Sequence, residues 1–284
     1  MPAVDIKEEL IKLHSNNIAD YPEGIILPID KPYRWSSADV VRKVKYAATR
    51  FFGKKNLKVG HAGTLDPLAT GILIVCIGPA TKRAEELQAS AKQYIAGVTF
   101  GATTPSYDLE KDIDNLFSLD GVSEQSIKEV LPSFIGEQDQ IAPLFSAKSV
   151  DGVRAYETAR KLYKQGKMDE GEGILTANRI TIYDLQFNFL RSSREGAVTP
   201  QQTLGDSSRI NVADISGHDL LTASITVDCS KGTYIRALAR DLGEALGSGA
   251  FLSSLRRTKN GGFMIEDAID LESAIKLFAI PVSA

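Results

Sequence analysis

Residues 59–73 read VGHAGTLDPLATGIL and place three glycines and one carboxylate, Asp66, directly before an apolar run. Pro67 disfavours helical dihedral angles at Asp66, and glycine lets a backbone turn tightly and lets a bulky ligand come close. The stretch therefore predicts a stiff loop that presents Asp66 at the start of a buried strand. A simpler interpretation is that Asp66 caps a short helical turn at Ala69 or Thr70, and these residues alone leave both open.

Apolar patterns on either side of this loop predict a mixture of strands and helices. The serine and aspartate at Ser36 and Asp39 form a capping-box signature that opens a helix. A second helical pattern, KGTYIRALARDLGEALG, ends at Gly247. The segments with strand patterns are 24–30, 72–77, 92–101 and 221–229. Because no regular strand–helix–strand alternation is present, we predict an α+β fold in a single domain spanning residues 1–284.

Composition narrows the class of protein. The chain has 284 residues, of which 43% are hydrophobic and 24% charged, as in ordinary globular proteins. Its N-terminus lacks a signal-peptide pattern, and Cys76 and Cys229 lie in apolar segments, so we expect reduced, buried thiols in a cytoplasmic protein and no membrane association. No metal-ligand spacing, GxGxxG or GxxxxGK[ST] motif occurs, so we expect no cofactor and no metal.

Charge is segregated along the chain although the net charge is only −3. The stretch from Arg42 to His61 holds bases and no acids, and a second basic segment runs from Lys148 to Lys167. Acidic residues gather instead in 108–120. Such segregation is typical of a nucleic-acid footprint, although each basic cluster could equally be the solvated face of a helix.

The Asp66 stretch, GHAGTLDPLATGIL, resembles the catalytic motif of the TruB family of tRNA pseudouridine synthases. Five further segments match motifs of that family in the same order. They are DKP with the serine pair at Ser36 and Ser37, KQYIAGVTFG, APLFSAKSVDGVRAYETAR, KGTYIRALARDLGEALG and LRRTKNGGF. Together the matching segments span about residues 24–270 of the chain.

The resemblance implies a pseudouridine synthase fold, in which a central, mostly antiparallel mixed sheet is flanked by helices and loops. It also implies a thumb insertion at about 103–170, and we interpret residues 192–218 as a polar loop. The implied activity is conversion of uridine 55 in the T loop of tRNA to pseudouridine, by a cytoplasmic monomer that needs neither guide RNA nor cofactor. Many relatives carry a C-terminal PUA domain, for which this chain leaves no room, so we expect a form without it.

The reaction breaks the N1–C1′ glycosidic bond, turns the uracil and joins C5 to C1′. One carboxylate can stabilise or trap the sugar cation, and the resemblance implies Asp66 for this role. It further implies that Arg236 pairs with Asp66, and that Tyr94 stacks on the flipped uracil and assists proton transfer at C5. The residues implied in RNA or base binding are His61, Tyr234, Leu255, Asp108, Lys148 and Arg154. Taken singly, each has a plainer interpretation: Tyr94 and Leu255 as core residues, Arg236 as a surface residue.

Some positions depart from the family pattern. Arg34 stands where the first motif usually has glycine. The family motif usually has a lysine at the position of Ser149, whereas in this chain the lysine, Lys148, comes one position earlier. Two rival functions stay open: a tRNA-binding or folding factor of the same fold with little catalysis, and the guide-dependent branch of the superfamily. The first rival predicts loss of Asp66, Tyr94 or Arg236, and all three are present.

Overall fold

The computed structural model describes residues 13–146, 148–150, 152–171, 173–192 and 210–279. These residues form two compact units. Unit 1 holds residues 13–92 and 256–279, and unit 2 holds the described residues from 93 to 192 and from 210 to 255. Residues 193–209 of the expected polar loop lie outside the described residues. The single-domain organisation stays a prediction.

Unit 1 is built around a buried strand that follows the Asp66 loop. This strand, β3 (Ala69–Ile77), is buried along its whole length and pairs with β1 (Ile25–Lys31) in antiparallel register. The strand order in this unit is β14-β1-β3-β12, with β2 on β3 and β13 on β12. The predicted strand at 72–77 is therefore confirmed, and it begins earlier, at Ala69.

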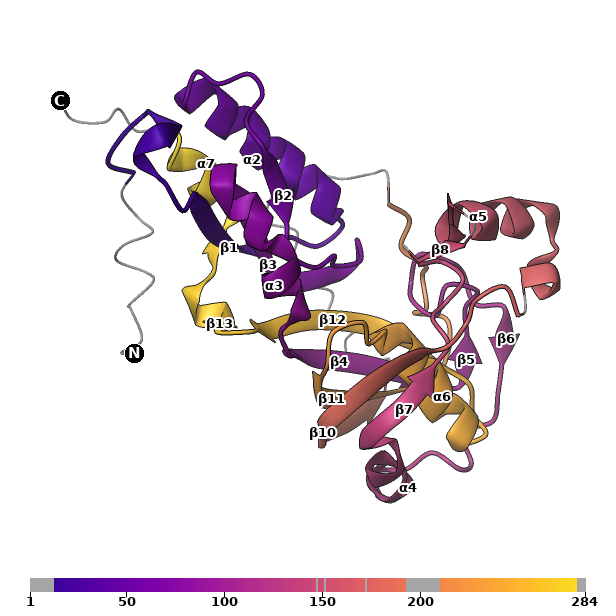
Figure 1. The fold of residues 1–284 in the computed structure, drawn as a ribbon. Helices are drawn as coiled ribbons and strands as arrows, with labels where there is room; N and C mark the ends of the chain where they lie inside the picture. Colours follow the sequence, from indigo (N-terminus) through magenta and orange to yellow (C-terminus); the bar gives the residue numbers. More distant parts are fainter. Residues whose placement is uncertain (1–12, 147, 151, 172, 193–209, 280–284) are drawn as a thin grey trace. The chain divides into compact units, whose positions relative to one another are not determined.

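The helices of unit 1 include the one that the capping box predicts. In α2 (Ser37–Phe51), the Ser36 hydroxyl accepts from the Asp39 N–H at 3.1 Å, and the Asp39 carboxylate accepts from the Ser36 N–H at 3.3 Å. Figure 1 shows α2 beside α7, and both contact strands of this unit. The remaining elements are η1 (Ile18–Asp20), β2 (Val59–His61), η2 (Gly78–Arg83), α3 (Ala84–Ala89), β13 (Phe263–Met264), η6 (Ile265–Asp267), β14 (Ile269–Asp270) and α7 (Leu271–Lys276).

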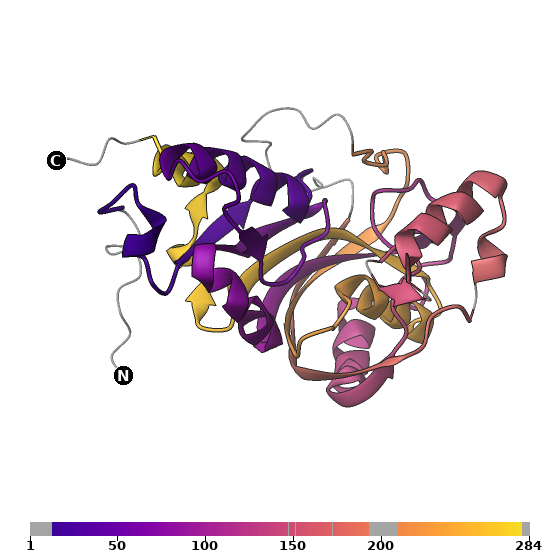
Figure 2. The same cartoon turned by 45° about the horizontal axis from the view of Figure 1, so that its top comes forward.

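Unit 2 is a curved sheet with the order β12-β4-β11-β10-β7, and Figure 2 shows its strands bending around α6 (Ile235–Ala245). The predicted strands are present as β4 (Lys92–Phe100) and β11 (Leu221–Cys229), and β12 (Ala250–Asn260) contributes residues to both units. The other elements are β5 (Ala102–Thr103), β6 (Asn115–Leu116), α4 (Glu124–Val130), η3 (Leu131–Phe134), β7 (Gly136–Gln140), β8 (Ser149–Val150), β9 (Val153–Arg154), α5 (Ala155–Gln165), η4 (Met168–Gly171) and β10 (Asn178–Ser192).

Strand pairing supports the predicted fold class. The β1–β3, β2–β3, β7–β10, β10–β11 and β12–β13 pairs are antiparallel, whereas β1 and β14 pair in parallel. Within the described part of the chain, helices and strands are mixed without a repeated strand–helix–strand unit. The prediction of an α+β fold with a mostly antiparallel mixed sheet is confirmed.

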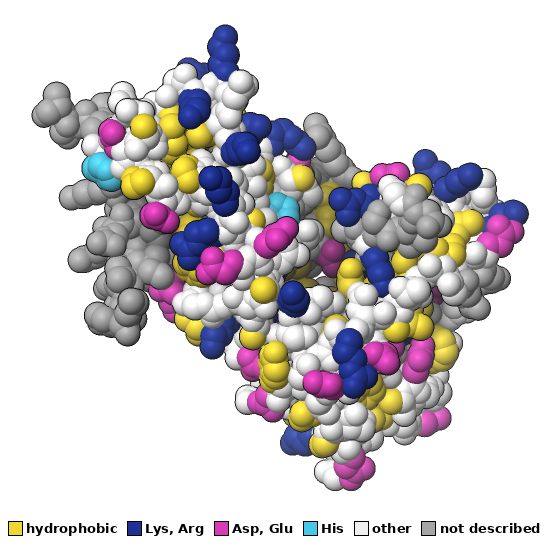
Figure 3. Space-filling model, viewed as in Figure 1, with side chains coloured by type: hydrophobic (Ala, Val, Ile, Leu, Met, Phe, Trp, Pro, Cys, Tyr) yellow, Lys and Arg dark blue, Asp and Glu magenta, His cyan; other side chains and the backbone are white. Residues whose placement is uncertain are grey.

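Basic side chains gather on one surface of each unit. In unit 1 they lie on and just after α2, and in unit 2 they lie on α5; Figure 3 shows Lys and Arg crowded over both regions. Lys45, Lys55 and Lys58 of unit 1 line a hollow of about 530 Å³ together with Thr81. Each of these lysines is exposed.

Candidate active site

The Asp66 loop lies between two strands of unit 1, and Asp66 itself is only partly buried. The Asp66 carbonyl accepts from the Ala69 N–H at 3.1 Å, which closes the turn that leads into β3. Gly71 adopts a φ of 98°, in the region that favours glycine, and its N–H donates to the Asp30 carboxylate at 3.1 Å. The predicted stiff loop before a buried strand is thus present.

Side chains distant in sequence hold the two arms of this loop. The Ser37 hydroxyl accepts from the Leu65 N–H and donates to the Leu65 carbonyl, both at 2.9 Å. The Lys31 ammonium donates to the Pro67 carbonyl at 3.1 Å. Because several side chains must be placed for the loop to form, the position of Asp66 is fixed by the core of unit 1 and not by the loop sequence alone.

Lys31 is an unusual cation because its side chain is completely buried. Its ammonium also donates to the carbonyls of Pro32 at 3.0 Å and Trp35 at 2.5 Å. Burial lowers the pKa of Lys31 to about 7, while nearby Asp66 acts to raise that pKa and Arg257 to lower it further. A charged lysine with three hydrogens suits three carbonyl acceptors, so the geometry favours the charged form that burial disfavours.

His61 closes the short strand β2 before the loop. Its Nδ1 is buried and has no hydrogen-bond partner among the described residues. Burial, with a smaller contribution from Arg257, lowers the pKa of His61 below its ordinary value. A neutral imidazole presents an uncharged ring, which suits stacking on an unstacked base.

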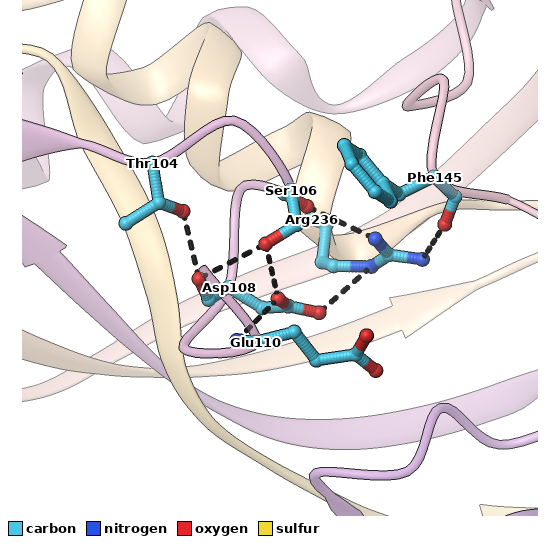
Figure 4. A network of polar contacts seen from close by, with 6 residues as sticks. All are labelled: Thr104, Ser106, Asp108, Glu110, Phe145 and Arg236. Carbon is cyan, nitrogen blue, oxygen red and sulfur yellow. Dashed lines mark hydrogen bonds and ion pairs between the residues drawn. The ribbon is translucent and has the colours of Figure 1, made fainter. Parts of the chain in front are cut away.

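Arg236 in unit 2 lies in a network of polar contacts at the start of α6 (Figure 4). Its Nη1 donates to the Ser106 carbonyl and its Nη2 to the Phe145 carbonyl, each at 2.9 Å. Its Nε lies 3.6 Å from Oδ2 of Asp108, and both side chains are about 5% exposed. The interpretation of Arg236 as an ordinary surface residue is therefore wrong.

Asp108 is held on its other side as well. Its Oδ1 accepts from the Ser106 hydroxyl at 2.6 Å and from the Glu110 N–H at 2.9 Å, and its carbonyl accepts from the Thr104 hydroxyl at 2.7 Å (Figure 4). The structure thus gives Asp108 a partner that the sequence did not predict, since Arg236 was expected to pair with Asp66. Asp66 belongs to unit 1 and Arg236 to unit 2, and their pairing stays a prediction, as does the role of Asp108 in RNA contact.

The other predicted site residues of unit 2 lie on or beside its sheet and helix. Tyr94 in β4 and Leu255 in β12 are each 8% exposed. The Tyr234 N–H donates to Oε1 of Gln140 at 2.8 Å, and its carbonyl accepts from the same side chain at 3.2 Å. The Tyr234 side chain contacts the buried cluster of Ala142, Ala155 and Leu175.

The predicted thumb residues are anchored differently. The Lys148 ammonium donates to the Thr176 carbonyl and, at 3.0 Å, to Oδ1 of Asn178, so this lysine links the segment before β8 to the start of β10. Arg154 is exposed at the residue before α5. Their roles in RNA binding stay predictions, and Arg154 is the more accessible of the two.

No group of His, Cys, Asp or Glu among the described residues could hold a metal ion. No helix of the described chain is long and apolar enough to cross a membrane. Cys76 and Cys229 are both buried, as predicted, and burial raises the pKa of Cys76 to about 11.

Comparison with known proteins identifies the class. Residues 49–235 match the N-terminal domain of the TruB family pseudouridylate synthases, and residues 236–279 match a tRNA pseudouridylate synthase B C-terminal domain. The chain is 44% identical over 255 residues to tRNA pseudouridine synthase B of Phocaeicola vulgatus, covering 89% of this chain and 93% of that protein. It is 42% identical over 254 residues to the protein of that name from Flavobacterium johnsoniae, with coverage of 89% and 95%.

Solved structures share the fold. The chain superimposes on a chain of a Cbf5–Nop10–Gar1 complex with a TM-score of 0.56 and 25% identity, covering 92% of this chain and 56% of that one. An archaeal box H/ACA Nop10–Cbf5 complex gives a TM-score of 0.54 at 22% identity, covering 89% and 53%. The chain thus spans about half the length of those two chains.

These matches define a pseudouridine synthase, an isomerase that acts on uridine. More narrowly, the chain belongs to the TruB family of pseudouridylate synthases.

Proposed function

We propose that this protein converts uridine 55 in the T loop of tRNA to pseudouridine, without guide RNA and without a cofactor. The observation that carries the proposal is Asp66, a part-exposed carboxylate on a loop fixed by buried side chains of a TruB-family chain. The relatives that match most of its length are named tRNA pseudouridine synthase B, which supports a tRNA substrate.

The proposed chemistry begins at C1′ of the ribose. Asp66 stabilises or traps the sugar as the N1–C1′ bond breaks, and the detached uracil then turns so that C5 bonds to C1′. C5 loses its proton and N1 gains one, so the product is an isomer of the substrate. Tyr94 is the group proposed to stack on the base and assist this proton transfer.

A uridine in a folded loop must leave its stack before its sugar can be reached. We propose that the basic residues on and after α2 and on α5 bind the phosphate backbone, while His61 contacts an unstacked base of the loop. The exposure of Lys45, Lys55 and Lys58 around a hollow supports this role for unit 1. We further propose that the protein acts in the cytoplasm as a monomer.

The test is incubation of the purified protein with an unmodified tRNA transcript and no other RNA, followed by mapping of pseudouridine at single-nucleotide resolution. We expect modification at position 55 alone. Modification elsewhere would contradict the assignment of the site. Tight tRNA binding without modification would favour the rival function of a tRNA-binding or folding factor, and modification only after addition of a guide RNA would favour the guide-dependent branch.

A further inference from the structure

Arg257 in β12 is among the largest completely buried side chains of the described protein, with only 1% of its surface exposed. Its guanidinium reaches across to the Asp66 loop. Nε donates to the Ile72 carbonyl at 2.7 Å, Nη2 to the Gly63 carbonyl at 3.1 Å and Nη1 to the Thr64 carbonyl at 3.4 Å. One side chain therefore holds main-chain groups on both sides of Asp66.

Arg257 belongs to a set of donors that together provide a hydrogen bond to each main-chain carbonyl of the loop. Between Ala62 and Pro67 every main-chain carbonyl accepts a hydrogen bond. The donors, in order along the loop, are Asn260 for Ala62, Arg257 for Gly63 and Thr64, Ser37 for Leu65, the Ala69 N–H for Asp66, and Lys31 for Pro67. Such over-determination is how a protein fixes a segment that has no regular secondary structure.

The chemistry of arginine suits this position better than that of lysine. A guanidinium stays charged when buried and carries its N–H groups in a rigid plane, so it can bond several carbonyls in a fixed arrangement. Arg257 forms no ion pair among the described residues, and its hydrogen bonds all go to main-chain carbonyls. Its contacts are therefore those of a group that places a backbone.

The main chain of Arg257 is also placed against the far end of the loop. A Cβ added to Gly71 would lie 2.2 Å from the Arg257 carbonyl oxygen and 2.6 Å from its nitrogen. Only glycine permits so close an approach. Backbone contact at Gly71 and side-chain contact at Gly63 thus fix the loop relative to β12 at two separate points.

We propose that Arg257 is a positioning residue for Asp66: it sets the geometry of the carboxylate without touching the substrate. The inference rests on the proposed function, because it concerns the step that Asp66 performs. A displacement of a reacting group by about 1 Å can cost on the order of 10²-fold in rate, so loosening the loop should reduce turnover much more than RNA binding.

The test compares Arg257→Lys with the wild type in single-turnover reactions at saturating tRNA transcript, together with the Kd for that transcript. Lysine retains a positive charge but loses the planar fork. We expect the saturating rate to fall on the order of 10²-fold while the Kd stays within about twofold, since the contacts lie inside unit 1. Arg257→Gln is the second variant: a neutral amide costs less to bury than a charge, which keeps the test open if lysine prevents folding.

The matched control is Arg256→Lys, one residue away. Arg256 is partly exposed: its Nη1 and Nη2 pair with Asp30 at 3.2 and 2.7 Å, and its Nη1 lies 3.4 Å from the Thr70 hydroxyl. Unlike Arg257 it donates to no main-chain carbonyl of the loop, and lysine can keep the ion pair with Asp30. We expect this variant to react within about threefold of the wild type. If only the Arg257 variant is slow, the cause is loss of its contacts with the loop carbonyls and not replacement of any arginine in β12.

Amide hydrogen exchange provides a readout that needs no activity. If Arg257 positions the loop, the variant should exchange faster at residues 63–69 while β1 keeps its protection. Equal acceleration throughout unit 1, or a folded variant with a saturating rate within threefold of the wild type, would overturn the proposal. An inactive wild type would refute the proposed function and leave the exchange result to decide whether Arg257 holds the loop.

Discussion

Each unit of the molecule directs a buried arginine at main-chain carbonyls, but the charges around the two arginines differ. In unit 2, Arg236 has the Asp108 carboxylate at 3.6 Å, so the pair is close to neutral as a whole. In unit 1, Arg257 and Lys31 are both buried and hydrogen-bond to carbonyls. A carboxylate on the Asp66 loop lies near the buried Lys31, which also has Asp30 and Asp39 close by, whereas one placed beside Arg236 shares a cation with Asp108. The same structural device thus holds the loop that carries Asp66 in unit 1 and joins Arg236 to Ser106, Asp108 and Phe145 in unit 2.

The largest effect on the reaction rate is expected for replacement of Asp66, the carboxylate on the loop of unit 1. Asp66→Asn is nearly isosteric but neither nucleophilic nor anionic, so the single-turnover rate should fall by several orders of magnitude. The fold and the affinity for tRNA should be kept, because the amide occupies the same place. Rates from rapid-quench assays at saturating tRNA, with Kd from filter binding, decide the matter. A rate within about tenfold of the wild type would remove Asp66 from its proposed role.

The second effect tests whether the network of unit 2 is only a scaffold. Arg236→Lys keeps a charge but loses the planar geometry that bonds Ser106 and Phe145. If Arg236 pairs with Asp66, the saturating rate should fall on the order of 10²-fold while the Kd changes little. If Arg236 binds phosphate instead, binding should weaken, the salt dependence should become shallower, and turnover at saturation should survive.

Asp108→Asn sharpens this result, because it removes the charge next to Arg236 and leaves an oxygen for the Ser106 hydroxyl and the Glu110 N–H. If Asp108 only holds Arg236 in place, Asp108→Asn should lower the saturating rate, as Arg236→Lys does. As an RNA contact, it should change the Kd first. Thermal unfolding of both variants checks that the comparison is made on folded protein, since breaking a buried ion pair can cost about 3–5 kcal/mol.

A third effect follows from the pKa of Lys31, which burial lowers to about 7. Between about pH 7 and its unfolded value of 10.5, the unfolded chain holds this proton and the folded protein does not. The Lys31 contribution to the free energy of unfolding should therefore increase as the pH rises from about 7 to 10.5, by at most about 1.4 kcal/mol per pH unit. The same contribution is lost when the pH is lowered through this window to about 7. Denaturant unfolding of wild type and Lys31→Met across the window isolates this contribution, because the other titrating groups cancel in the difference. Parallel curves would mean that Lys31 stays charged when buried.

The smallest effect concerns exposed charge. Replacing Lys55 by Ala should weaken tRNA binding modestly and reduce the slope of log K against log salt by roughly one, if this lysine contacts a phosphate. The control is Lys128→Ala, because Lys128 is also exposed but already pairs with Glu124 in α4. Equal slopes for Lys55→Ala and the wild type would mean that Lys55 is a solvated side chain and contacts no phosphate.

Local patterns predicted the elements of the fold well. The capping box at Ser36 and Asp39, the apolar run of β3 and the alternation of β11 each have a local physical cause, and each element appears where that cause operates. The sequence also predicted that Asp66 lies on a loop directly before a buried strand. Local sequence patterns do not, however, determine which residues a charged side chain contacts.

The charged contacts could not be predicted because they join segments far apart in the chain. Arg236 was expected beside Asp66, yet in its own unit it lies against Asp108, 128 positions earlier in the sequence. Lys31 and Arg257 belong to quoted motifs, but nothing in DKP or LRRTKNGGF indicates that their side chains are buried. A lysine directly after the apolar run IILPID was the one available signal, since a charge that continues such a strand must find acceptors.

The distance along the chain between Arg257 and the carbonyls that it holds also has a consequence for biosynthesis. Gly63 and Arg257 are separated by 194 positions. A ribosome making this chain at about 5–20 residues per second therefore synthesises Gly63 roughly 10–40 s before it adds Arg257. During that interval helix α2 and the β1–β3 pair can form, whereas the carbonyls of Gly63 and Thr64 remain hydrated. The nascent protein can therefore form α2 and the β1–β3 pair well before Arg257 is available to hold the Asp66 loop.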